Sequence, residues 1–399
     1  MLDGLLKERP VNQIESLVLV GLFLVAITLP GLGLLFRWHV MTEQEENRRQ
    51  SNFPSLTRNS DSFFYFPENF TAYFNDHFGF RATLVHWNAL AKLRILGQTS
   101  SPRVMVGKNG WLYLVTEFSA TGKHLYPLYS EDELRNWKLL LEGRRDWLAQ
   151  RGIRYIFTVF PRKEVIYPEF LPDTFHQEEQ SRLDQLTDYL KKSSDVEIVD
   201  LRPGLLQAKA DQQIYYQTDT HWNFRGGYSG YQSIIRTLRN WYPDTKQLSL
   251  SDCSVRVESR DGDLAAVLGL RGYLREETSI LFPSPAPYRF LVQPIEMSDR
   301  PVDLLVTENQ DHKPPSLVMF DDSAGGALVD FFSTNFRRGV FVFYPRLDRP
   351  LIESERPDVV IQEMGELGLL NPESPNLEEL KALNSPTQSK TVKVFARAK

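Results

Sequence analysis

The longest run of apolar positions lies near the N-terminus. Residues 17–36, LVLVGLFLVAITLPGLGLLF, contain no charged side chain. About 20 apolar residues in a helix cross the hydrocarbon core of a bilayer. A secretory signal has a shorter apolar core and a small-residue cleavage site, and no convincing site follows this run. The pattern predicts an uncleaved transmembrane anchor, whose orientation the flanking basic residues do not settle.

The positions after this run divide the chain further. Polar residues over 37–62 predict a juxtamembrane stalk, and aromatic-rich residues 63–81 lead into a predicted helix over 82–96. The segment 107–115, GKNGWLYLV, has Asn-Gly between short apolar pieces and predicts a hairpin. Residues 371–399 are rich in Asn, Pro, Ser and Lys, which predicts a flexible tail.

Strand and helix patterns alternate through the rest of the chain. Ser130 and Glu133 have the spacing of a capping box that opens a helix with one apolar face. Buried-strand patterns then lie at 154–160, 196–201, 316–320, 339–344 and 356–364, with helical patterns at 177–192, 227–242 and 324–336. Strands separated by helices predict an α/β domain with a mainly parallel sheet.

Composition narrows the class of protein. The 399 residues are 42% hydrophobic and 24% charged, as in ordinary globular proteins. A net charge of −5 gives no reason to expect nucleic acid as a partner. The one cysteine, Cys253, excludes an internal disulfide framework and a multi-cysteine zinc site.

An acid and an imidazole stand two positions apart in YYQTDTHWNFRGGY, residues 215–228. In an extended segment such residues share a side, about 6.6 Å apart at Cα. The carboxylate of Asp219 can then bind Nδ1–H of His221 and leave Nε2 free to take a proton. Alternatively, Asp219 caps a turn and His221 is structural. These two residues alone do not decide.

A candidate nucleophile follows a later strand pattern, in residues 316–328, SLVMFDDSAGGAL. Ser323 falls where the next predicted helix begins, beside backbone N–H groups that can hold an oxyanion. Gly325 and Gly326 would let a substrate approach the backbone. Serine is also a common helix N-cap, so both interpretations of Ser323 stay open.

Several segments agree in order and spacing with one family. They are TDTHWN, GKNGWLYL, ENRR and FP with YFNDHFGFR, and RPDVVIQEM. Over roughly residues 45–365 the chain resembles the SGNH-hydrolase-like alginate O-acetyltransferases of the AlgJ and AlgX type. The resemblance implies a three-layer α/β/α domain, over 63–370, in the periplasm or at the cell exterior. Residues 1–16 would then be cytoplasmic, and the anchor would cross the bacterial inner membrane.

The resemblance also implies an activity. The enzyme would move acetyl groups, through an acetyl ester on its serine, onto hydroxyls of an exported polysaccharide. A multi-spanning membrane-bound O-acyltransferase would donate the acetyl group. No cofactor is expected. An acetyl-esterase with the same triad, or a non-catalytic polysaccharide-binding or assembly protein, remain alternatives.

Matched position by position, Asp219, His221 and Ser323 fall on the acid, base and nucleophile of that family. The N–H groups around Ser323 and Ala324 would hold the oxyanion. Lys163 matches a lysine common in the family and is predicted either to line the cleft or to be a solvated surface residue.

Three further residues have weaker predictions. Asn223 and Arg225 are candidates for positioning substrate. For Asp263 a place in a turn is favoured over one facing the site. A metal site built from Asp219, His221, Asp321 and Asp322 is a poor match, because one histidine with carboxylates is not a typical transition-metal set.

Asp321 departs from the family pattern, which has a small residue there. On an extended strand Asp321 and Ser323 would share a side. A carboxylate about 4 Å from a developing oxyanion costs on the order of 4 kcal/mol at an effective dielectric constant near 20. Asp321 must therefore turn away, be neutralised or have its own role, or the site is impaired.

Overall fold

The computed structural model describes residues 13–36, 49–55, 60–115, 128–175, 180–296 and 301–370. The chain forms two compact units. One comprises residues 1–101 with 266–270, and the other comprises 102–265 with 271–399. The predicted tail, 371–399, lies outside the described residues, as do parts of the predicted stalk.

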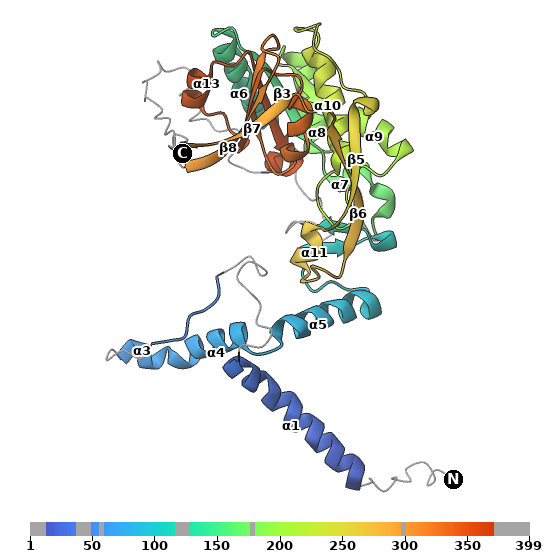
Figure 1. Ribbon diagram of the computed structural model, residues 1–399, viewed down its shortest axis with the longest axis vertical. Coiled ribbons are helices and arrows are strands. Elements are labelled where there is room, and N and C mark those ends of the chain that lie inside the picture. The colour runs from blue at the N-terminus through green and yellow to red at the C-terminus, as the bar shows by residue number, and fades with distance from the viewer. Residues whose placement is uncertain are drawn as a thin grey trace. The chain divides into compact units, whose positions relative to one another are not determined.

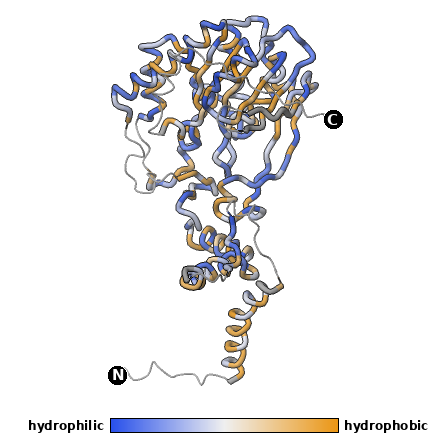
Figure 2. The backbone as a smooth tube through the Cα atoms, turned by 90° about the vertical axis from the view of Figure 1, so that its left-hand side faces the viewer, coloured by the Kyte–Doolittle hydropathy of each residue, from blue (hydrophilic) through white to orange (hydrophobic). Residues whose placement is uncertain are grey.

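Helices make up the first unit. They are α1 (Gln13–Phe36), α3 (Ser60–Phe64), α4 (Phe66–His77) and α5 (Arg81–Leu96). Within α1, residues Ser16–Gly33 are long and apolar enough to cross a membrane, and only 6% of that window is buried. Figure 2 shows the apolar character of α1 along most of its length. The helix predicted over 82–96 is confirmed by α5.

A mixed sheet forms the centre of the second unit. Among the described residues its seven strands lie in the order β4-β3-β11-β9-β10-β8-β7. The strands are β3 (Arg154–Phe160), β4 (Ile198–Asp200), β7 (Tyr288–Glu296), β8 (Pro301–Asn309), β9 (Ser316–Asp321), β10 (Arg338–Phe343) and β11 (Val359–Gly365). Neighbours from β4 to β10 are parallel, whereas β8 and β7 extend the sheet antiparallel. The predicted, mainly parallel sheet is confirmed.

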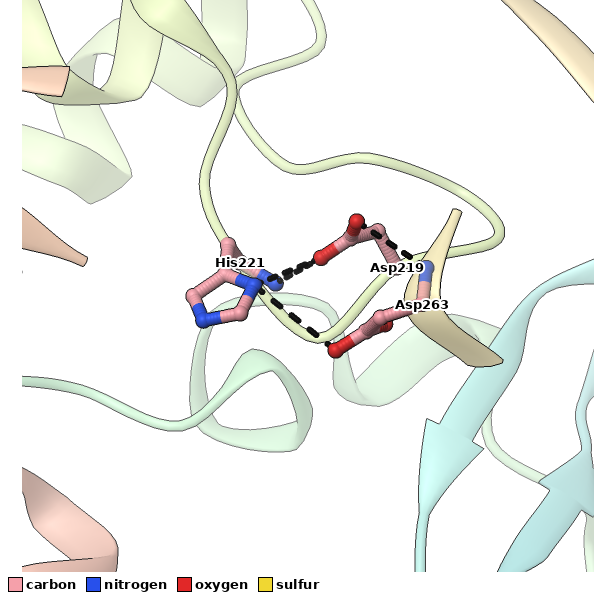
Figure 3. Close-up of side chains that lie close together, drawn as sticks. All are labelled: Asp219, His221 and Asp263. Atoms are coloured by element: carbon pink, nitrogen blue, oxygen red, sulfur yellow. Dashed lines mark hydrogen bonds and ion pairs between the residues drawn. The ribbon is translucent and has the colours of Figure 1, made fainter. Parts of the chain in front are cut away.

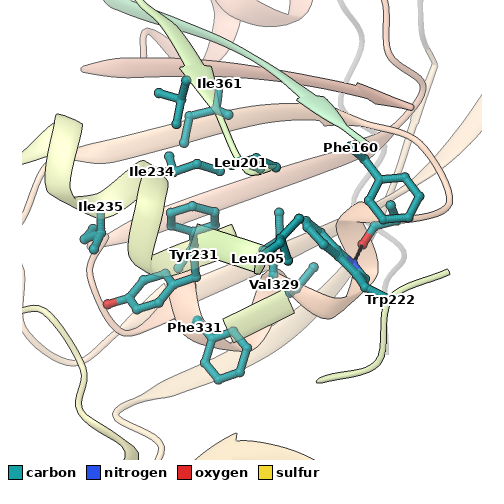
Figure 4. Packing of buried hydrophobic residues seen from close by; sticks show 14 of the residues in the cluster. Phe160, Leu201, Leu205, Trp222, Tyr231, Ile234, Ile235, Val329, Phe331 and Ile361 are labelled. Carbon is teal, nitrogen blue, oxygen red and sulfur yellow. Dashed lines mark hydrogen bonds between the residues drawn. The ribbon is translucent and has the colours of Figure 1, made fainter. Parts of the chain in front are cut away.

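Helices cover both faces of this sheet, which gives three layers (Figure 1). Successive strand side chains point to opposite faces, so Val360 and Ile361 of β11 belong to different apolar clusters. The cluster with Ile361 packs against α9 (Arg202–Asp211), α10 (Phe224–Leu238) and α12 (Val329–Ser333), as Figure 4 shows. The other packs against α6 (Glu131–Ala149), α8 (Arg182–Ser193) and α13 (Arg349–Glu355).

Local signals in the sequence explain several of these elements. The capping box of Ser130 and Glu133 is present at the start of α6. The predicted hairpin is the antiparallel pair β1 (Val104–Val106) and β2 (Leu112–Leu114). Its connection is the 3₁₀ turn η1 (Lys108–Gly110), where Asn109 and Gly110 both have positive φ, as asparagine and glycine allow.

Other elements differ from the prediction or were missed. The helix predicted over 324–336 is broken into a 3₁₀ turn, η5 (Gly325–Ala327), and the short α12, because adjacent glycines disfavour helix. The antiparallel ribbon of β5 (Cys253–Asp261) and β6 (Arg275–Pro283) was not predicted. The remaining short elements are α7 (Lys163–Ile166), η3 (Pro168–Phe170), η4 (Leu250–Asp252), α11 (Asp263–Val267) and η6 (Glu366–Leu370).

Candidate active site

Asp219 and His221 lie in a tight loop, not in the extended segment that their spacing suggested. A bridge between Tyr215 and Trp222 closes the loop. Within it, Oδ1 of Asp219 accepts the backbone N–H of His221 at 3.0 Å and lies 2.6 Å from Nδ1 of the same residue. Aspartate commonly forms such a turn with the N–H two residues on. One carboxylate therefore both shapes the turn and orients the imidazole (Figure 3).

Ser323 contacts the other ring nitrogen of His221. Its Oγ lies 2.7 Å from Nε2 of His221, although 102 positions separate the two residues. Strand β9 ends at Asp321, so Ser323 stands in the turn that follows, with its side chain exposed. The structure thus brings together the three residues that the sequence analysis singled out for acid, base and nucleophile.

Hydrogen-bond partners keep the buried Asp219 ionised. Its side chain is 2% exposed, and Oδ2 accepts from Nη2 of Arg260 at 2.9 Å and from the N–H of Asp263 at 3.1 Å. Burial by itself would raise the pKa of Asp219. The hydrogen bond and charge of His221, together with Arg260, outweigh burial and lower this pKa to about 2.

Asp263 is a second carboxylate beside the imidazole. Its Oδ2 lies 3.8 Å from Nδ1 of His221, and its two oxygens accept the N–H and the hydroxyl of Thr220. Burial would lower the pKa of His221, but the bond to Asp219 and the nearby charges, including Asp263, raise it above its ordinary value. The sequence favoured a place in a turn for Asp263 over one facing the site. In the structure Asp263 also faces the site.

Asp219, His221 and Asp263 are close enough to be tested as a metal-binding set, with ligand atoms within 4.8 Å of one another. The Asp219 oxygens, however, already accept from Arg260 and from backbone N–H groups, and a cation such as Arg260 opposes a bound metal ion. The chemistry of this set therefore favours a hydrogen-bonded network around the imidazole.

Lys163 holds the loop from within the protein. It is 3% exposed, and its Nζ donates to the main-chain oxygens of Leu112, Gln217 and Asp219 at 2.5, 3.0 and 2.9 Å. The prediction of a solvated surface lysine is wrong. Burial lowers the pKa of Lys163 to about 8 despite nearby acidic residues. With all three bonds directed at backbone oxygens, Lys163 acts on the position of the loop.

Other residues predicted for the site shape its backbone. Asn223 caps α10, accepting from the N–H groups of Arg225 and Gly226, and its amide donates to the Gln213 oxygen at 2.8 Å. The side chain of Arg225 is partly buried. Neither has a hydrogen bond to Ser323 or His221 within the described part of the chain, so their predicted role toward substrate remains untested.

The glycines after His221 allow close packing of α10. A Cβ built at Gly226 would lie 2.3 Å from the Ile214 oxygen, and one at Gly227 would lie 2.7 Å from Cβ of Ala327. A larger side chain at Gly227 would push α10 away from the turn that follows Ser323, and one at Gly226 would push it away from Ile214, which precedes the Asp219 loop. The glycines therefore belong to the support of the site.

Three acidic residues lie beneath the Ser323 turn. Asp321 is 3% exposed, and burial, followed by the charge of Asp322, raises its pKa well above the ordinary value. Burial likewise raises the pKa of Glu363. Asp321 packs under Gly325, where a Cβ would meet it at 2.4 Å. Burial thus favours the protonated form of Asp321, which weakens the electrostatic objection raised from the sequence.

Asp322 organises the backbone around the serine. Its Oδ1 accepts from the Ala324 N–H at 3.0 Å and its Oδ2 from the Gly365 N–H at 2.5 Å. The Ala324 N–H, predicted as an oxyanion donor, is thus engaged in this structure. Among the described residues the Ser323 N–H has no hydrogen-bond acceptor, which leaves it available for an oxyanion.

Comparison with known proteins places this site in a family. A model described as "SGNH hydrolase-like domain, acetyltransferase AlgX" matches residues 104–310. The chain belongs to this family. The matched region contains the loop with Asp219 and His221 and ends before Ser323, so the role of the serine rests on its geometry. Membership confirms the resemblance inferred from the sequence.

Individual relatives agree with this assignment. The "Probable alginate O-acetylase AlgJ" of Pseudomonas aeruginosa is 30% identical over 147 residues, covering 35% of this chain and 34% of that protein. The protein of the same name from Pseudomonas fluorescens is 29% identical over 175 residues, or 42% of each chain. These alignments span well under half of the relatives, so activity does not transfer with them.

A solved structure supports the fold. "Bacillus cereus PatB1 with sulfonyl adduct" superposes with a TM-score of 0.52 at 16% identity, covering 69% of this chain and 97% of PatB1. At that identity the likeness concerns the fold alone. The three-layer α/β/α prediction is therefore supported both by the family match and by this comparison.

Proposed function

We propose that this chain is an O-acetyltransferase that moves acetyl groups through Ser323 onto hydroxyls of an exported polysaccharide. The observation that carries the proposal is the series of contacts from Asp219 to Nδ1 and from Nε2 to Ser323 Oγ, at 2.6 and 2.7 Å. The acceptor class is supported by the names of the relatives, which are probable alginate O-acetylases.

In the first half-reaction, His221 Nε2 takes the proton of Ser323 Oγ while that oxygen bonds to the acetyl carbon of the donor. The donor's leaving group then departs with this proton, and Ser323 carries an acetyl ester. Asp219, ionised at neutral pH, stabilises the imidazolium that forms between the two steps. Its second oxygen, bonded to Arg260, keeps the carboxylate in place.

The second half-reaction reverses these roles. A sugar hydroxyl gives its proton to Nε2 of His221 and attacks the acetyl carbon, and Ser323 leaves with that proton. The Ser323 N–H would stabilise the oxyanion in both halves. The Ala324 N–H can join only if its bond to Asp322 Oδ1 opens.

The setting of the reaction is part of the proposal. Helix α1 would anchor the chain in the bacterial inner membrane, with the α/β unit in the periplasm or at the cell exterior. The donor would be a membrane-bound O-acyltransferase that passes acetyl groups outward. The apolar window Ser16–Gly33 supports the anchor.

The test uses the full chain in detergent with 4-nitrophenyl acetate as donor and oligomannuronate as acceptor. Ser323→Ala should lower acetyl release by several orders of magnitude, as removal of a serine nucleophile does. Ser251→Ala, at an exposed serine of η4, is the matched control and should keep the wild-type rate.

Mass spectrometry of the acceptor separates the alternatives. Acetylated oligosaccharide formed by wild type and absent with Ser323→Ala would establish the transferase. Serine-dependent release without sugar acetylation would make the chain an esterase. Background rates in all three proteins would show a binding or assembly protein and refute the proposal.

A further inference from the structure

Helix α5 presents an apolar stripe to its surroundings. Leu84, Trp87, Ala91 and Ile95 recur every three or four positions and so share one face of the helix. Leu84 is 47% exposed, Trp87 64% and Ile95 78%. Exposed apolar side chains along a whole helix face indicate a surface that is covered by a membrane or by another protein.

The charge on α5 indicates what kind of partner this is. The helix contains Arg81, Lys92 and Arg94 and no acidic residue. Exposed apolar side chains that include a tryptophan, with basic residues nearby, are typical of surfaces that rest on a membrane interface. Basic residues near the surface are attracted to anionic lipid headgroups.

Aromatic residues at the end of α3 and just before α4 extend this pattern. Phe63, Phe64 and Tyr65 are 75%, 81% and 59% exposed. Aromatic side chains are enriched at the level of lipid headgroups. The exposed aromatic residues before α4 and the stripe on α5 belong to the same compact unit.

The contact with α1 fixes the depth of these helices. The junction between α4 and α5 lies against the end of the apolar window, where the Gly79 N–H donates to the Pro30 oxygen at 2.9 Å. A Cβ built at Gly33 would lie 2.6 Å from Cα of Gly79, so the two backbones touch. Gly33 is also the last residue of that window. With α1 spanning the bilayer, as proposed above, the start of α5 would lie at the edge of the hydrocarbon core.

We propose that α3, α4 and α5 form an interfacial platform that lies in the lipid headgroup region, with the apolar stripe of α5 at the acyl boundary. The anchor is then a spanning helix together with helices that rest on the bilayer. This proposal does not depend on acetyl transfer, because no residue of the platform belongs to the candidate active site.

The test uses the full chain in vesicles of phosphatidylethanolamine and phosphatidylglycerol. In a Cys253→Ser background, single cysteines replace Leu84, Ile95 or Leu139 and carry an environment-sensitive fluorophore. Leu139 of α6 is 47% exposed, the same as Leu84, and is the matched control in the α/β unit. Circular dichroism and candidate-site activity check that each variant is folded.

Labels at Leu84 and Ile95 should emit at shorter wavelength than the Leu139 label. Lipids with a nitroxide near the headgroup should quench them several-fold and leave the Leu139 label unquenched. Water-like emission at both α5 positions would overturn the proposal. Blue-shifted labels that the nitroxide lipids do not quench would also overturn it, because a protein would then cover the stripe. As a second readout, brominated lipids should quench native tryptophan emission less in Trp87→Phe than in wild type.

Discussion

The indole of Trp222 donates from Nε1 to the main-chain oxygen of Ala324 at 3.0 Å, with its side chain almost fully buried. Trp222 follows His221 in sequence, and Ala324 follows Ser323. This one hydrogen bond therefore joins the loop of the proposed base to the turn of the proposed nucleophile.

Replacing Trp222 with phenylalanine should separate these two loops. We expect Trp222→Phe to lower kcat by about 10- to 100-fold, because small misplacements of reacting groups are costly. It should also lower the free energy of unfolding by roughly 2 kcal/mol. Trp137→Phe is the control, since Trp137 is equally buried and belongs to the apolar cluster on the opposite face of the sheet. It should lose stability and keep kcat. Equal kcat in both variants would contradict the proposed link.

The rate should depend on pH through His221. The imidazole must be neutral to accept a proton, and its pKa is raised, so kcat/KM should rise with pH and reach half of its plateau above the ordinary histidine value of about 6.5. Asp263→Asn removes a negative charge near Nδ1 and should move this midpoint to lower pH. Asp261→Asn should leave it unchanged. An unmoved midpoint in Asp263→Asn would show that Asp263 has no electrostatic effect on the base.

Lys163→Met should weaken the support of the Asp219 loop. The substitution keeps the length and removes three hydrogen bonds to main-chain oxygens, including that of Asp219. We expect kcat to fall by about 10-fold or more with KM little changed. The free energy of unfolding should fall by about 1–3 kcal/mol. Lys209→Met, at a partly exposed lysine that binds the Ile166 oxygen, should keep kcat. A change confined to KM would place Lys163 in substrate binding instead.

Asp321→Asn tests whether this carboxyl is neutral. An amide resembles a protonated carboxyl, so activity should stay within about threefold of wild type. Asp322→Asn weakens the acceptors for the Ala324 and Gly365 N–H groups. It should lower activity by 10-fold or more, which corresponds to the loss of about one such hydrogen bond. Nearly equal losses in the two variants would mean that Asp321 acts in its ionised form.

The pH dependence of stability gives an independent test of the raised pKa of Asp321. Because the folded-state pKa is raised, the protonated carboxyl favours folding fully below the unfolded pKa of about 3.9, and this contribution is lost as pH rises through the folded pKa. Asparagine does not ionise. As pH rises above about 4, the free energy of unfolding of wild type should therefore fall relative to that of Asp321→Asn. Urea unfolding at several pH values measures this difference. A difference independent of pH would contradict the raised pKa.

Patterns local in the chain determined much of this protein. The charge-free run over 17–36 predicted α1, because a long apolar run can be recognised without a periodic pattern and without knowledge of tertiary contacts. The capping box at Ser130, the hairpin at Asn109 and the buried strands were predicted for the same reason, since their causes lie within a few residues. The spacing of Asp219 and His221 indicated a contact, although the backbone makes it as a turn.

Tertiary structure decided what surrounds the imidazole. Ser323 is 102 positions from His221, and Asp263 is 42; only the packing of α10 and the β5–β6 ribbon brings them to one place. The raised pKa of Asp321 and the contacts of Lys163 depend on burial, which is produced by all the elements packed around them. Whether a carboxyl is charged or a lysine is solvated is thus set by the folded environment, because desolvation arises only once distant segments exclude water.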